Sequence, residues 1–213
     1  MQIRREGPAI EAESFRIIEQ EMGEHGFNPL EFPLVRRVVH ATADFEIGCS
    51  LVFSAGAVQA GIQLIRRGCP ILTDIRMVAS GISRAALKQA GGGEVLCRID
   101  DPDVSAQSQA SGITRSAAAV RSFGPLLPES ILVIGNAPTA LREVLRLNQE
   151  EGIAPGFLIA VPVGFVDAAE SKEALMKTDL TFITNRGRKG GTPVAVALVN
   201  ALIHLILQEQ EAG

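Results

Sequence analysis

From Pro70 onward the chain alternates short apolar runs with longer segments of helical spacing, and this alternation constrains the fold more than any other feature. The apolar runs span residues 71–75, 94–99, 130–135, 156–162 and 180–184. The segments that follow them span residues 77–90, 108–123, 139–150, 167–177 and 193–208. Strands that alternate with helices require right-handed crossovers, which produce a mainly parallel sheet covered on both faces. The pattern predicts an α/β fold: a three-layer, doubly wound domain with a five-stranded sheet.

The residues before this core predict a helical extension. Apolar residues at helical spacing mark residues 9–23, and a second helix starts after Pro33 and runs into His40. A third spans residues 54–67, with Ser54 as its N-cap. A chain of 213 residues is long enough for one hydrophobic core, and no change in composition divides it. We therefore expect one domain over residues 1–213, with residues 1–69 packed on residues 70–213.

Composition and charge exclude several classes of protein. The formal net charge of -4 gives no general attraction to nucleic acid or to anionic membranes. The N-terminus lacks the apolar run of a signal peptide, and the apolar stretch 194–207 is too short to span a bilayer. Three widely spaced cysteines fit reduced thiols in the cytoplasm better than a disulfide framework or a zinc site. We expect a cytoplasmic protein without a bound metal.

Ligands of doubly wound sheets bind at the carboxyl ends of the strands, where this chain places Asp74, Asn136, Arg186 and Lys189. The loop NRGRKGGT (residues 185–192) joins basic side chains to glycines at the start of a helix, a combination that suits an anion. An ordinary glycine-rich turn with solvated basic residues is the alternative. Asn136 can donate and accept hydrogen bonds, but asparagine is also common in turns.

Two further segments carry polar residues at helix starts. GITRSAAA (residues 112–119) places Thr114, Arg115 and Ser116 among small residues, where the arginine could clamp a carboxylate or simply pack on its own sheet. In the segment 164–175, Asp167 and Glu170 have the spacing of a capping box, which predicts a structural role.

His40 is the best candidate for proton chemistry. It ends an apolar helical run and precedes the small residues of ATAD, whereas His25 and His204 have the surroundings of structural histidines. A single histidine is itself more often structural than catalytic. The sequence shows neither metal-ligand spacing nor a nucleophile elbow. General acid or base catalysis by one residue is therefore the expected chemistry.

Six segments together resemble the precorrin-8X methylmutase family of cobalamin biosynthesis. They appear in family order along almost the whole chain: VHATAD, PILTDIRMVASGISR, GITRSAAA, GNAPTAL, PVGFVDAAESKEAL and NRGRKGG. The resemblance implies a flavodoxin-like domain that forms a homodimer with its site near the interface. It also implies an isomerase that needs no cofactor. The enzyme would move a methyl group from C-11 to C-12 of a corrinoid, giving hydrogenobyrinic acid, or cobyrinic acid when cobalt is present.

The resemblance also assigns roles to residues. A histidine at the position of His40 is the catalytic acid of the family, and a polycarboxylate corrinoid needs basic groups around it. The expected substrate-binding residues are Ser14, Arg37, Asp74, Thr114, Arg115, Ser116, Asn136, Arg186 and Lys189. The sequence leaves open whether the substrate carries cobalt and which subunit supplies each residue.

Two non-catalytic alternatives remain at the level of sequence. A flavodoxin-like binding module, such as a receiver or flavin carrier, needs an acidic cluster or a hydroxyl-rich phosphate loop with stacking aromatics, and this chain has neither. A corrinoid-binding protein without turnover would keep the same pocket, so activity distinguishes it from the enzyme.

Overall fold

The computed structural model describes residues 7–212, so residues 1–6 and 213 of the expected domain lie outside the described part. Six strands form one sheet: β1 (Leu51–Phe53), β2 (Ile71–Thr73), β3 (Val95–Cys97), β4 (Ile131–Ile134), β5 (Phe157–Ala160) and β6 (Phe182–Asn185). The first helices are α1 (Gly7–Met22), α2 (Phe32–Thr42), α3 (Phe45–Cys49), α4 (Ala57–Arg66), α5 (Arg76–Gly81) and α6 (Arg84–Gln89). The later helices are α7 (Pro102–Ser111), α8 (Arg115–Phe123), α9 (Pro138–Arg146), α10 (Ala168–Leu175) and α11 (Thr192–Ala212). A 3₁₀ helix η1 (Gly124–Glu129) and a π-helical turn η2 (Leu147–Glu151) complete the elements.

The five apolar runs after Pro70 form the parallel part of the sheet, as predicted. The strand order is β1-β6-β5-β4-β2-β3, and every neighbouring pair except β1 with β6 is parallel. If the five parallel strands are renumbered from 1 to 5 in chain order, with β2 as strand 1, their order across the sheet from β3 to β6 is 2-1-3-4-5. The order reverses between β2 and β4, which is where ligands approach a doubly wound sheet.

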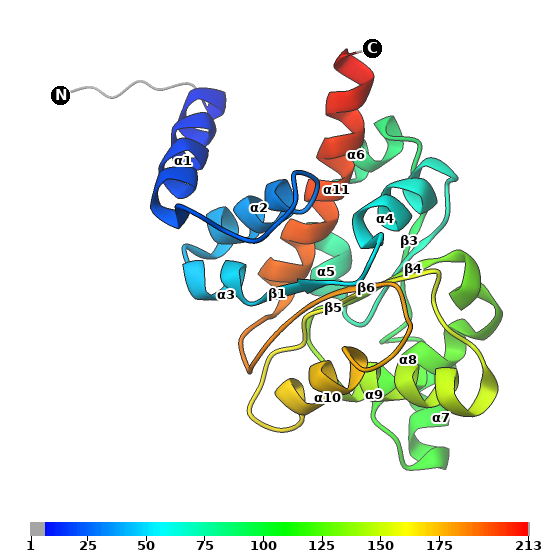
Figure 1. The fold of residues 1–213 in the computed structure, drawn as a ribbon. Coiled ribbons are helices and arrows are strands. Elements are labelled where there is room, and N and C mark those ends of the chain that lie inside the picture. Colours follow the sequence, from blue (N-terminus) through cyan, green and yellow to red (C-terminus); the bar gives the residue numbers. More distant parts are fainter. Residues whose placement is uncertain (1–6, 213) are drawn as a thin grey trace.

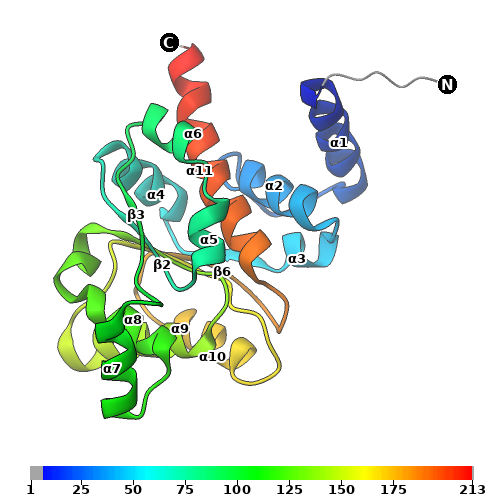
Figure 2. The same cartoon turned by 180° about the vertical axis from the view of Figure 1, so that it is seen from behind.

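The sheet lies between two helical layers, as Figures 1 and 2 show. Alternate residues of each strand enter opposite cores, because successive side chains point to opposite faces. Ile131 and Val133 of β4 join the core beneath α4, α5 and α11, whereas Leu132 and Ile134 join the core beneath α8 and α9. All four of these side chains are fully buried. The expected three-layer α/β architecture is therefore present.

The prediction of a wholly helical extension and a five-stranded sheet was wrong at one strand. Leu51–Phe53 pairs antiparallel with β6 and forms the sixth, edge strand. The run has only three residues, so its period could not be read from the sequence. Ser54 does not cap a helix. Its hydroxyl accepts a hydrogen bond from the Phe182 N–H at 2.8 Å, and α4 starts three residues later, at Ala57 after Gly56.

Two predicted helices are each broken into two. The segment 77–90 forms α5 and α6, which are separated by extended backbone at Ile82 and Ser83. The segment 108–123 contains the end of α7 and the whole of α8. The two helices are separated at Gly112, whose φ of 64° lies in the left-handed region that glycine adopts readily. The second break matters for the site, because it creates a new helix N-terminus at Arg115.

Helix α11 runs through the core of the molecule beside α2 and α4 (Figure 1). At 21 residues it is longer than its apolar stretch suggested. Among residues 7–212 it is the one helix long and apolar enough to cross a membrane by length and composition. Val194, Leu198, Leu202 and Ile206 are fully buried inside the protein, which identifies α11 as a core helix.

Candidate functional site

His40 lies in the last turn of α2, on the surface of the protein. The buried face of α2, formed by Leu34, Val35, Val38 and Val39, packs into the core and leaves His40 facing out. The helix is capped at its C-terminus by Ala43, which has a φ of 52° and donates its N–H to the Val39 carbonyl oxygen at 2.8 Å. His40 therefore stands at the carboxyl end of α2, beside the turn that ends the helix.

Helix α1 contributes an aromatic wall beside His40. The Phe15 ring meets the imidazole edge-on, with 5.2 Å between the ring centroids. The guanidinium groups of Arg36 and Arg37 lie over the same ring, at 4.2 Å and 4.7 Å from its centroid. Arg37 also pairs with Glu11 of α1, and its hydrogen bond holds the pKa of the Glu11 carboxyl below its usual value. These contacts fix the position of α1 against α2 at the histidine.

Two hollows open on either side of His40. The first, the α1–α2 hollow, measures about 280 Å³ and is lined mainly by apolar residues, with Ser14 and Glu21 as polar members. The second, the α2–α11 recess, measures about 320 Å³ and is lined by Arg37, His40, Ala41, Pro193, Val196, Ala197, Asn200 and His204. His40 is common to both hollows, so a group bound in either one can reach its ring.

The basic loop after β6 is tied to the segment that follows His40. The Lys189 ammonium donates to Asp44 at 2.7 Å and to Glu46 at 2.8 Å. The Asp44 carboxylate also accepts from the Ile47 N–H and so caps α3. The Lys189 hydrogen bond lowers the pKa of Asp44. Lys189 is thus a structural link between the loop and the histidine segment, with two carboxylates already bound.

Lys172 of α10 forms hydrogen bonds that hold the same loop in place. It is fully buried, and its ammonium donates to the Asn185 side-chain oxygen at 3.0 Å and to the Lys189 carbonyl oxygen at 2.7 Å. The Asn185 amide nitrogen donates to the Lys189 carbonyl as well, at 2.8 Å. Because both partners of the ammonium are neutral oxygens, desolvation dominates and lowers the pKa of Lys172 to about 8.

Asp74 organises the loop after β4. Its side chain is fully buried and accepts hydrogen bonds from the backbone N–H groups of Gly135, Asn136 and Ala137 at 2.9 to 3.0 Å. Burial raises the pKa of the Asp74 carboxyl, and the three N–H donors oppose that rise by stabilising the ionised form. The buried carboxylate thus holds the backbone of the loop in place, whereas Asn136, a residue of this loop, is exposed.

The start of α8 lies beside the start of α9. The Thr114 hydroxyl donates to the Thr139 hydroxyl at 2.8 Å and accepts from the Ala117 N–H, which makes Thr114 the N-cap of α8. Arg115 follows at the first helical position and is exposed, and Ser116 is half-buried. The Thr114–Thr139 bond joins the two helix starts, and Arg115 and Asn136 lie next to it in the chain, so we call these residues the polar group beyond β4.

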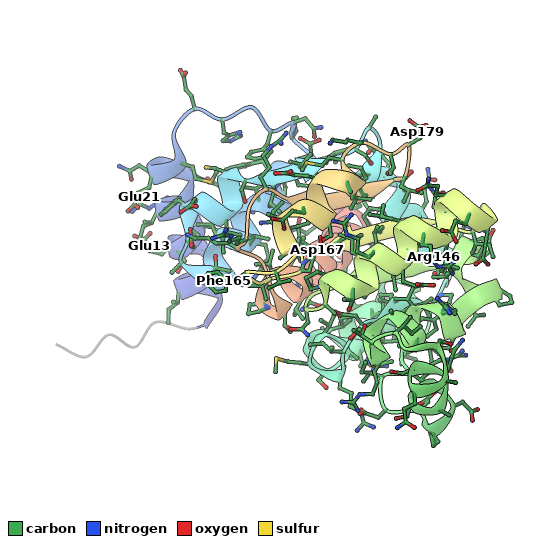
Figure 3. All side chains as sticks on the ribbon, turned by 90° about the horizontal axis from the view of Figure 1, so that it is seen from below. Glu13, Glu21, Arg146, Phe165, Asp167 and Asp179 are labelled. Carbon is green, nitrogen blue, oxygen red and sulfur yellow. The ribbon has the colours of Figure 1, made fainter. Side chains whose placement is uncertain are left out.

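Between this polar group and the basic loop, the β5–α10 loop (residues 163–166) exposes apolar side chains. Phe165 and Val166 are each 84% exposed, and Val163 is 43% exposed. The Arg188 guanidinium lies 5.7 Å from the centroid of the Phe165 ring, and the Gly164 N–H donates to the Arg188 carbonyl oxygen. Figure 3 shows Phe165 on the α1 side of the view, with Arg146 on the other side.

Comparison with known proteins places this arrangement in one family. A model of the family described as precorrin-8X methylmutase matches residues 9–205. The chain belongs to the precorrin-8X methylmutase family. A cobalt-precorrin-8 methylmutase of Priestia megaterium is 45% identical over 193 residues, which cover 91% of this chain and 85% of that protein. A precorrin-8X methylmutase of a Sinorhizobium species is 40% identical over 93% of this chain and 94% of its own length.

A solved structure of a family member has the same fold. The precorrin-8X methylmutase of Thermus thermophilus superposes with a TM-score of 0.88 at 45% identity, covering 95% of this chain and 98% of that one. The family resemblance drawn from the six segments is therefore confirmed. The related proteins are named methylmutases, and methylmutases are isomerases.

Within this methylmutase fold, the expected site residues form two groups in the chain. Ser14, Arg37 and His40 come together around the α1–α2 contact. The second group stands along the carboxyl ends of the strands: Thr114, Arg115, Ser116 and Asn136 near β4, and Arg186 after β6. Neighbouring strands are about 4.8 Å apart, so β4 and β6 are separated by roughly 10 Å. The exposed β5–α10 loop lies between them.

Three interpretations from the sequence need correction. Asp167 and Glu170 form no capping box, because Asp167 has a φ of 62° and binds Arg142 instead. Asp74 lies beneath its loop rather than at the surface, so it positions Asn136 and has no free oxygen to offer a ligand. His204, interpreted as a structural histidine, is exposed and lines the α2–α11 recess.

Lys172 was missed, although a signal for it exists. Ala168, Ser171, Lys172 and Leu175 recur at helical spacing, and all four are buried. A lysine in such a buried stripe has to find hydrogen-bond partners in the interior. In this family member those partners belong to the loop that carries Lys189.

The buried lysine predicts how stability changes with pH. The unfolded chain binds the Lys172 proton more tightly than the folded one, so the free energy of unfolding should rise as pH increases from about 8 to about 10.5. The rise relative to Lys172→Met should approach roughly 3 kcal/mol. Urea unfolding of both proteins across this range measures it, with the exposed Lys177→Met as control. A difference between wild type and Lys172→Met that does not change with pH would contradict this prediction.

Proposed function

We propose that this protein catalyses the methyl shift from C-11 to C-12 of precorrin-8X or cobalt-precorrin-8, giving hydrogenobyrinic or cobyrinic acid. The observation that carries the proposal is the family match over residues 9–205. The related proteins bear both substrate names, at 45% identity for the cobalt form and 40% for the metal-free form.

His40 is the proposed general acid. An intramolecular methyl shift breaks the bond to C-11 as the bond to C-12 forms, so it needs neither a nucleophile nor a redox group from the protein. Protonation of the macrocycle draws electron density away from the migrating centre, and the proton returns to His40 after the shift. The exposure of its ring and its position in the lining of both hollows support this role.

The carboxyl edge of the sheet is the proposed binding surface. A corrinoid has apolar ring faces and carboxylate side arms at its rim. The exposed Val163, Phe165 and Val166 offer an apolar contact, and Arg115 and Arg186 lie on either side of it to meet the carboxylates. Asn136 supplies an exposed amide at the same edge. Lys189, already bound to two acidic side chains, contributes by holding the basic loop in place.

We further infer a homodimer in the cytoplasm. Exposed Ile10 and Ile17 on α1 leave apolar surface that a second copy would cover. Cys49, Cys69 and Cys97 are all free thiols, which suits a reducing compartment. The 2-1-3-4-5 order of the parallel strands supports assignment of the core to the flavodoxin-like group.

Incubation of the purified protein with precorrin-8X and, separately, with cobalt-precorrin-8 tests the function. We expect the absorbance spectrum of at least one of them to convert to that of the methyl-shifted product, and the faster conversion assigns the metal state. Tight binding of both substrates without conversion of either would instead support a corrinoid-binding protein without turnover.

The two flanking arginines predict the strength of product binding. Arg115→Ala and Arg186→Ala should each weaken the binding of the polycarboxylate product by about tenfold, since each removes a charge-assisted hydrogen bond. Absorbance titration measures the dissociation constants. Arg84→Ala, which removes an exposed arginine of α6, serves as the control and should bind like the wild type. Wild-type affinity in both site variants would remove these arginines from the proposed surface.

A further inference from the structure

The α2–α11 recess contains three basic side chains, and each of them can donate hydrogen bonds to an anion. Among residues 7–212, its lining includes Arg37, His40 and His204 and neither aspartate nor glutamate. The α1–α2 hollow differs, because its ionisable members are His40 and Glu21 and its walls are mostly apolar. The two sides of His40 therefore suit different parts of a ligand, an apolar part on one side and a negatively charged part on the other.

His204 and His40 come from helices far apart in the sequence and belong to one electrostatic neighbourhood. Both rings contribute, with Arg37, to lowering the pKa of the Glu11 carboxyl, and Arg37 makes the largest contribution. Glu11 occupies only part of the Arg37 guanidinium, which has five N–H donors. Imidazole offers at least one N–H in either protonation state. Arg37 and His204 thus retain donors for a further carboxylate.

The walls of the recess are held in place independently of any ligand. The Asn200 side chain accepts from the Ser83 N–H and donates to the Gly81 carbonyl oxygen, both at 3.0 Å, so it joins α11 to the α5–α6 connection. A Cβ at Gly81 would lie 2.6 Å from a Val196 methyl, so the close approach of these helices needs glycine. Asn200 is therefore part of the wall, and His204 is left facing the open space.

We propose that the α2–α11 recess binds a carboxylate side arm of the substrate, with His204 and Arg37 as the residues that hold it. This inference rests on the proposed corrinoid substrate and extends it to a second hollow. The volume of about 320 Å³ accommodates a carboxylate arm with its remaining water. Binding of one arm there places the macrocycle against His40, which stands at the junction of the two hollows. His204 is a binding residue in this scheme, and His40 remains the acid.

Kinetics of His204→Ala and His204→Gln test the role of this side chain. His204→Ala should raise KM about five- to tenfold and leave kcat within about twofold, because it removes a donor to a bound carboxylate. His204→Gln keeps an N–H donor and should recover part of the lost affinity. Circular dichroism checks the folding of both, and His25→Ala, at the other end of α2, is the matched control. An unchanged KM in His204→Ala would overturn the proposal.

Histidine acylation by diethyl pyrocarbonate provides a test that needs no turnover. Peptide mass spectrometry follows the labelling of His25, His40 and His204 with and without the isolated corrinoid product. We expect the product to slow labelling of His40 and His204 and to leave His25 unchanged. Equal labelling of His204 in both conditions would refute the recess even if the enzyme is active. Protection of His204 in a protein that converts neither substrate would refute the activity and retain the recess.

Discussion

Replacement of His40 by alanine should lower kcat by about 10² to 10⁴ and leave the affinity for the product within a few-fold of wild type. The ring stands at the surface end of α2, between two hollows, where its loss removes a proton donor without opening the core. Single-turnover absorbance measures the rate, and equilibrium titration with the product measures the affinity. His40→Gln should be equally slow, because an amide keeps a hydrogen bond but transfers no proton.

The matched control for this prediction is His25→Ala. His25 is also exposed, and its ring stacks on Phe32 at the opposite end of α2, with 3.9 Å between the centroids. It should turn over substrate at close to the wild-type rate. Wild-type kcat in His40→Ala would refute the assignment of His40 as the acid. A large loss of product affinity with little change in kcat would make His40 a binding residue instead.

Replacement of Asp74 by alanine should cost roughly 3–5 kcal/mol of unfolding free energy. The substitution removes the carboxylate that accepts hydrogen bonds from three backbone N–H groups, so these N–H groups lose their acceptor. The loop that carries Asn136 should then lose its fixed conformation, so product affinity should fall as well. Urea unfolding followed by circular dichroism gives the free energy, and absorbance titration gives the affinity.

An exposed aspartate separates burial from charge in this experiment. Asp179 precedes β6 and is exposed. Its replacement by alanine should change the unfolding free energy by no more than about 0.5 kcal/mol. If Asp74 instead contacted the ligand directly, Asp74→Ala would weaken product binding and would change the unfolding free energy by no more than Asp179→Ala does. That result would contradict a structural role for the buried carboxylate.

The parallel core could be predicted from sequence because each of its strands is a continuous apolar run between turn residues. Leu72 and Leu132, for example, lie in strands buried on both faces, which leaves such runs without polar interruptions. The edge strand β1 could not be predicted, since three residues carry no readable period and its pairing with β6 is set by contacts far along the chain. The helix break at Gly112 was missed because glycine also occurs inside helices.

The site was predicted less completely than the core, since exposure is a tertiary property. Asp74 stands at a strand end, where ligands usually bind, but the loop after β4 folds over it and uses both of its oxygens. His204 lies in an apolar helix, yet the neighbouring helices leave its side uncovered. His40 combined a helix end with small neighbours in the sequence, and the structure places it at the surface between two hollows.

Carbon-13 NMR of the reaction tests the central claim most directly. The substrate is prepared with ¹³C in the methyl group at C-11 and incubated with the purified protein, in the metal state that gives the faster absorbance change. We predict that the labelled signal moves to the methyl position on C-12, with no label lost to solvent or to any other molecule. A labelled methyl that stays on C-11 while the corrinoid is bound would contradict the proposed methyl shift.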